Sequence, residues 1–87
     1  MTDEEKTKAV RLARHIASDI SFYNEQKIIQ GIEQDNLFEL LKEEIEEGRE
    51  LYRSRVGAEL YQATNFFDRA LADVILRSKA HVKSKIW

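Results

Sequence analysis

The 87-residue chain contains no cysteine, no proline and only three glycines. Without cysteine it can form no disulfide, no thiolate metal site and no thiol nucleophile. Because proline is absent and glycine occurs only at Gly31, Gly48 and Gly57, little in the chain interrupts a helix. No apolar run approaches the roughly 18 residues that a membrane-spanning helix needs. These absences favour long helices held by noncovalent packing, and they predict no membrane span.

The formal net charge of −2 hides an uneven distribution along the chain. Residues 25–50 carry nine acidic and three basic side chains, whereas residues 51–87 carry three acidic and seven basic ones. With 43% hydrophobic and 34% charged residues, the composition is typical of a globular protein of one small domain. We expect residues 1–78 to form a single helical-bundle domain. Residues 79–87 would then be a basic C-terminal tail or an overhanging helix end.

The spacing of apolar residues predicts an all-α fold, a small antiparallel bundle of three long helices and one short helix. The four helices are expected at residues 3–22, 25–34, 37–56 and 58–82. Thr2 and Glu5 have the spacing of a capping box, which would begin the first helix. The Thr64-Asn65 pair could divide the last helix, because both side chains compete for nearby backbone hydrogen bonds.

The third expected helix has an apolar seam of period 3.5, the spacing of a helix that packs along its whole length. The seam consists of Phe38, Leu41, Ile45, Gly48 and Tyr52. Gly48 on this seam has two interpretations. It admits a bulky side chain from a facing helix, or it is a glycine that a long helix tolerates.

One pattern along the chain resembles a known helical module. It consists of Ala13-Arg14-His15-Ile16-Ala17-Ser18-Asp19-Ile20, Tyr23-Asn24, Lys27, Gly31, the stretch from Leu37 to Leu41, Glu43-Glu44-Ile45, Tyr52, Arg55-Val56-Gly57, Asn65-Phe66-Phe67 and Ala70-Leu71. The pattern covers about residues 9–76 and resembles a small module found mainly in deltaproteobacteria and related lineages, often behind a zinc-ribbon or signalling domain. This chain lacks the cysteines of a zinc ribbon. The resemblance implies an accessory or interaction role in a bacterial protein, and it brings no assigned activity or functional residue.

The residues that could carry catalysis or bind a metal do not form a recognised constellation. Glu43 and Glu47 lie one helical turn apart and could face a hard cation, but a solvated acidic face is the favoured interpretation. His15 and Asp19 are also one turn apart, and two ligands do not make a metal site. No serine has a context that suggests activation, and the isolated glycines form no phosphate-binding loop. We therefore expect no enzyme, no cofactor and no bound metal.

The stretch from residue 77 to residue 87 is the most unusual part of the sequence, because it holds four basic residues and no acidic one. The candidate interaction residues are Arg77, Lys79, Lys83, Lys85 and Trp87. A basic amphipathic end can bind an acidic protein, a membrane surface or nucleic acid. Alternatively, its lysines only keep a helix end soluble and interact with the negative end of the helix dipole. In a dimer, the tail of one copy could lie on the acidic third helix of another.

From these observations we interpret the chain as a non-enzymatic helical interaction or regulatory module of a bacterial cytoplasmic protein. Its partner would be another protein, unidentified from the sequence, and a homodimer is one form that the interaction could take. The alternative is a small nucleic-acid-binding regulator that acts through the basic C-terminal helix. The net charge of −2 speaks against nucleic acid as the partner.

Overall fold

A computed structural model describes the backbone of residues 2–86 and the side chains of residues 2–78. Residues 2–86 form six helices and contain no strand, which confirms the all-α prediction. The helices are α1 (Asp3–Tyr23), α2 (Glu25–Gln34), α3 (Leu37–Leu40), α4 (Lys42–Val56), α5 (Ala58–Ala63) and α6 (Phe66–Ile86). In this part of the chain, no helix is both long enough and apolar enough to cross a membrane.

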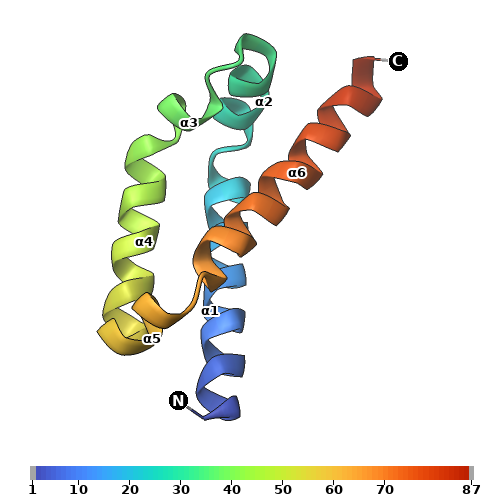
Figure 1. Cartoon of the computed structure of the whole chain (residues 1–87). Coiled ribbons are helices and arrows are strands. Elements are labelled where there is room, and N and C mark those ends of the chain that lie inside the picture. Colours follow the sequence, from blue (N-terminus) through green and yellow to red (C-terminus); the bar gives the residue numbers. More distant parts are fainter. Residues whose placement is uncertain (1, 87) are drawn as a thin grey trace.

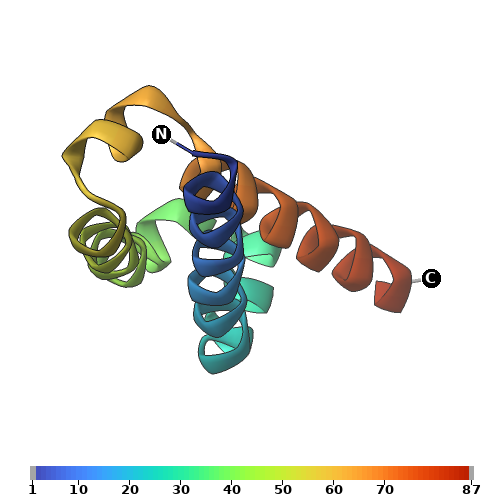
Figure 2. The ribbon, with the colours of Figure 1, turned by 90° about the horizontal axis from the view of Figure 1, so that it is seen from below.

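Helix α1 is the element on which the other long helices pack (Figure 1). Helix α4 runs antiparallel to α1 along one side, and α6 crosses α1 on another side. Figure 2 looks from below and shows α4 and α6 on different sides of α1. In both views the last turns of α6 extend away from the other helices. The two helices packed on α1 therefore diverge towards the end of the molecule that holds α2 and α3.

The core is built around one face of α1. Small side chains on this face, Ala13 and Ala17, are completely buried, which allows neighbouring helices to approach closely. The other buried apolar residues are Ala9, Ile16 and Ile20 of α1 together with Ile28, Leu37, Leu41, Tyr52, Leu60, Phe67, Ala70, Leu71 and Ile75. The largest of them, Tyr52 of α4 and Phe67 of α6, stack with their ring centroids 5.6 Å apart. This pair joins the two helices that flank α1.

The structure departs from the predicted four helices at two breaks. The prediction of one helix over 37–56 was wrong, because the chain leaves helical geometry at Leu41 (φ −100°, ψ 7°). There the Leu41 side chain turns into the core and is only 1% exposed. The second break, at Thr64-Asn65, is the one that the sequence indicated. Thr64 is extended, and its hydroxyl donates a hydrogen bond of 2.7 Å to the Leu60 carbonyl. The three long helices are thus α1, α4 and α6, with the shorter α2 and two very short helices between them.

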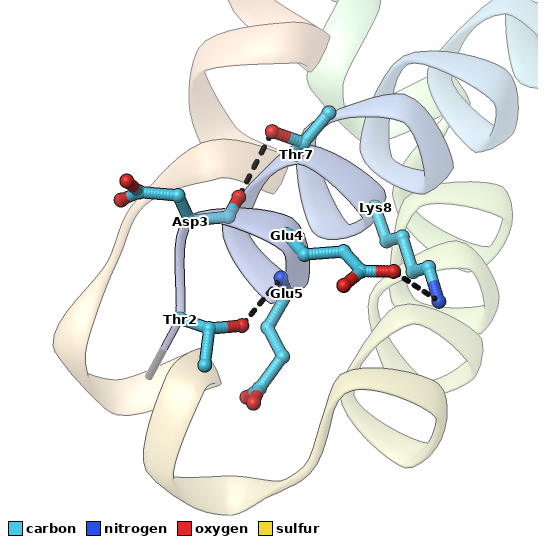
Figure 3. Close-up of polar contacts among 6 residues, drawn as sticks. All are labelled: Thr2, Asp3, Glu4, Glu5, Thr7 and Lys8. Atoms are coloured by element: carbon cyan, nitrogen blue, oxygen red, sulfur yellow. Dashed lines mark hydrogen bonds and ion pairs between the residues drawn. The ribbon is translucent and has the colours of Figure 1, made fainter.

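The N-terminus of α1 is capped by the Thr2 hydroxyl, which is the Thr2 half of the predicted capping box (Figure 3). The Thr2 hydroxyl accepts a hydrogen bond of 3.1 Å from the Glu5 amide, which satisfies one of the free amides of the first turn. The Thr7 hydroxyl donates to the Asp3 carbonyl at 2.9 Å. The acidic residues of this turn also interact favourably with the positive end of the helix dipole.

Two glycines allow close contacts between helices. A Cβ atom on Gly48 would lie 2.9 Å from the Cδ1 atom of Ile20 and 3.0 Å from the Cγ2 atom of Ile16. Of the two interpretations of Gly48, the structure therefore supports the one in which it admits bulky side chains. At Gly31 a Cβ atom would lie 2.6 Å from the Cα atom of Leu37, because the chain turns back at Asp35 (φ 58°) and packs α3 on α2.

We predict that Gly31→Ala destabilises the fold, although alanine is the better helix former by about 1 kcal/mol. The new methyl group must displace the backbone at Leu37, so the free energy of unfolding should fall by about 1–3 kcal/mol. Urea denaturation followed by circular dichroism measures this change. The control Gln30→Ala lies at an exposed position of the same helix, and it should shift stability by less than about 0.5 kcal/mol. Equal stability of the two variants would contradict the close contact.

Candidate functional site

The structure places only part of the predicted basic site. Arg77 of α6 forms an ion pair with Asp73, with 3.3 Å between Nη2 and Oδ2, and both side chains are exposed. Lys79, Lys83, Lys85 and Trp87 lie outside the residues whose side chains the structure describes. Among the grooves that the described side chains form, one lies between each pair of the long helices.

The groove between α4 and α6 is the most apolar of these three. We call it the α4–α6 groove, and it has a volume of 410 Å³. Its lining consists of Phe38, Ile45, Arg49, Asp68, Leu71, Ala72, Ile75 and Leu76. Phe38, from α3, is 63% exposed, and Leu76, from α6, is 67% exposed. Large apolar side chains are therefore exposed to solvent on both walls of one groove.

An arginine fixes the polar end of this groove. The Nη2 atom of Arg49 lies 2.7 Å from the Oδ1 atom of Asp68, and Nη1 donates a hydrogen bond of 3.5 Å to the Tyr61 hydroxyl. The guanidinium also lies over the Phe67 ring, 5.2 Å from its centroid. The hydrogen bonds that Arg49 donates to Asp68 and Tyr61 raise the pKa of Arg49. Arg49 thus connects α4, α5 and α6 where α6 begins.

Tyr52 is a buried residue next to this end of the groove. Its side chain is 1% exposed and contacts the rings of Phe67 and Tyr61. Among the described residues its hydroxyl has no hydrogen-bond partner. Burial raises the pKa of the Tyr52 phenol, and the neighbouring Thr64 offsets only part of that shift. Tyr52 is therefore a structural residue with a buried, neutral hydroxyl.

The groove between α1 and α4 is lined by three of the four residues considered above for metal binding, His15, Asp19 and Glu47, and not by Glu43. It has a volume of 370 Å³. The Nε2 atom of His15 lies 3.4 Å from the Oδ2 atom of Asp19, and both side chains are largely exposed. Glu44 accepts a hydrogen bond of 2.7 Å from Lys27, and this bond lowers the pKa of Glu44. Among the described side chains, no three histidines and carboxylates gather as metal ligands would. The polar contacts here are a surface histidine–aspartate pair and a lysine–glutamate ion pair.

The groove between α1 and α6 brings the predicted Arg77 together with two arginines that sequence reasoning missed, Arg14 and Arg69. Arg14 of α1 and both Arg69 and Arg77 of α6 line this groove of 780 Å³. The i,i+4 spacing of Arg69, Asp73 and Arg77 was a signal in the sequence that these side chains share a helix face. Arg14 joins them through the packing of α1 on α6, which a single sequence does not show.

Comparison of the chain with protein-family models, with curated proteins and with solved structures finds no match. The resemblance to the deltaproteobacterial module therefore stays a prediction.

We predict that Tyr52→Phe leaves stability at pH 7 unchanged or raises it by up to about 1 kcal/mol, because a buried hydroxyl without a partner is removed.

The phenol has a raised pKa in the folded state, so the wild type should lose stability as the pH rises above about 10, the pKa of an unfolded tyrosine. The Tyr52→Phe variant should not show this loss of stability at alkaline pH. Chemical denaturation at several alkaline pH values measures it. Tyr23→Phe, which changes an exposed tyrosine, should keep the wild-type loss, and identical profiles for Tyr52→Phe and wild type would contradict the prediction.

Proposed function

We propose that the chain is a non-enzymatic interaction module that binds a protein through the α4–α6 groove. The observation that carries this proposal is the exposure of Phe38 and Leu76 on opposite walls of one apolar groove. Exposed apolar groups that converge on a groove are typical of a binding surface, because a partner that covers them removes them from water. A bacterial and cytoplasmic setting belongs to the same proposal and rests on the sequence alone.

The chemistry of the groove supports binding rather than catalysis. None of the eight lining residues is a serine, threonine, histidine or tyrosine, so the lining offers no hydroxyl or imidazole group. Its two ionisable residues, Arg49 and Asp68, are paired with each other across 2.7 Å. A paired guanidinium and carboxylate can orient a partner, but neither is free to act as a general acid or base.

The test places a photo-crosslinking amino acid at position 38 in the cells that naturally make the protein. We expect adducts with one or a few specific proteins, because Phe38 stands at the wall of the groove. Leu76→Asp should reduce the adduct yield at least about tenfold, as the loss of a central apolar contact does. The matched control places the crosslinker at position 22, where Phe22 is 75% exposed but lies outside the α4–α6 groove. The same adducts from both positions, or adducts that Leu76→Asp leaves unchanged, would contradict the proposal.

A second candidate function is nucleic-acid binding through the basic C-terminal helix. The observation in its favour is that Arg14, Arg69 and Arg77 line a single groove. Two of these arginines, Arg69 and Arg77, belong to the helix whose last turns carry the tail lysines. Clustered arginines can contact successive phosphates, although Asp73 in the same groove already pairs with Arg77.

If this second candidate is correct, the protein should retard a short DNA duplex at about 50 mM salt, and raising the salt should abolish the retardation. Arg14→Ala should weaken binding and reduce the slope of log K against log salt by about 0.9, the value for one lost phosphate contact. The control Arg55→Ala removes an arginine that lines the opposite groove, so it should leave the affinity unchanged. Absence of retardation, or equal effects of the two variants, would exclude this function.

A further inference from the structure

The α4–α6 groove has a candidate occupant within the chain itself. We propose that the C-terminal turns of α6 from one copy lie in the α4–α6 groove of a second copy, so that two copies exchange these turns. This inference rests on the proposed function and names its partner as a second copy of this chain.

The path of α6 makes its end accessible to another molecule. Ile75 is the last residue of α6 that is fully buried among those described, and the helix continues to Ile86. At 1.5 Å per residue, residues 79–86 add about 12 Å of helix. Figures 1 and 2 show these turns leaving the other helices rather than folding back on them. An end that projects from its own fold can reach the groove of a second copy.

Charge complementarity favours this occupant over an uncharged helix. Residues 37–50, which contribute Phe38, Ile45 and Arg49 to the groove, contain six acidic and two basic side chains, although two of the acids line the opposite groove between α1 and α4. From residue 74 onwards the chain has no acidic residue and four basic ones, Arg77, Lys79, Lys83 and Lys85. Glu39 and Glu46 each follow a groove residue directly, are exposed, and form no ion pair within the described side chains. A basic helix end in the groove would therefore lie beside acidic groups that are free to attract it.

Reciprocal exchange also produces a closed assembly. Each copy supplies one basic helix end and one apolar groove flanked by Glu39 and Glu46, so a twofold arrangement satisfies both sites of both copies. Leu76 belongs to α6 and lines the groove, so it lies next to the incoming helix. The expected product is a dimer, with no unpaired end from which a filament could grow.

Sedimentation equilibrium of the purified full chain over a range of concentrations tests the inference. The weight-average mass should rise from 10.2 kDa towards twice that value, and higher salt should weaken the association. Leu76→Asp should weaken dimerisation at least about tenfold. The matched control is Leu51→Asp, which places the same charge at a half-exposed leucine of the opposite groove and should leave the dimer intact. Circular dichroism checks that both variants fold.

Charge reversal gives a second and independent measurement. Glu39→Lys with Glu46→Lys should weaken the dimer, and so should Lys79→Glu with Lys83→Glu. Mixing these two variants should give a heterodimer in which one exchanged end is held by the reversed charges and the other by the original charges. Combining all four changes in one chain should restore the affinity to within about threefold, because each reversed tail again meets residues of opposite charge. Reversal of two exposed charges on α1, Lys6→Glu with Arg11→Glu, is the control and should have no such effect.

Two results would overturn the inference. One is a chain that stays monomeric at all concentrations, and the other is a fourfold variant that dimerises no better than the twofold ones. In either case, crosslinks from position 38 to a different protein would leave the proposed function standing. If position 38 gives no specific adduct at all, the proposed function fails as well.

Discussion

The burial of one face of α1 is the constraint on which the remaining structure depends. Because Ala13 and Ala17 are completely buried, neighbouring helices can approach the α1 backbone closely, and Gly48 lets α4 do so against Ile16 and Ile20. Close packing of this kind gives many dispersion contacts for little side-chain volume. A chain of 87 residues can bury only a modest core, so the stability of the fold depends on this close packing.

The α4–α6 groove follows from this constraint. Both α4 and α6 pack on α1, so the contact between them is a consequence of how each is oriented there. Where α6 begins, the stack of Tyr52 on Phe67 and the ion pair of Arg49 with Asp68 hold the two helices together. Farther along, α6 leans away from α4, and the α4–α6 groove opens between them. The exposure of Phe38 and Leu76 is therefore a result of the crossing geometry, not of poor packing within one helix.

Most of the helices could be predicted from the sequence because their information is local. Apolar periodicity indicated α1 and α2, and the competition of Thr64 for backbone hydrogen bonds indicated the break before α6. The break at Leu41 could not be predicted, because a leucine on an apolar seam fits a continuous helix equally well. What decides it is that the break turns Leu41 into the core, and this depends on tertiary packing.

The candidate site was less predictable for the same reason. Arg49 and Asp68 are far apart in the sequence, and each belongs to a helix with many other charges. Phe38 belongs to the seam that was expected to pack along its whole length, yet it is exposed in the structure. The basic tail was visible in the sequence as a run of charge, whereas the groove that could receive it exists only after α4 and α6 have packed on α1.

Stability and association are coupled in a protein of this construction. A partner that binds the folded state and not the unfolded chain stabilises the fold by RT ln(1 + [L]/Kd), which amounts to about 2.7 kcal/mol at a concentration one hundred times Kd. Folded proteins are stable by only about 5–15 kcal/mol, and small domains lie at the lower end of this range. Covering Phe38 and Leu76 would therefore contribute a substantial fraction of the stability of this chain. In the proposed association, the apolar surface that is exposed in the isolated fold is the surface that the partner covers, and the packing of α6 across α1 leaves it exposed.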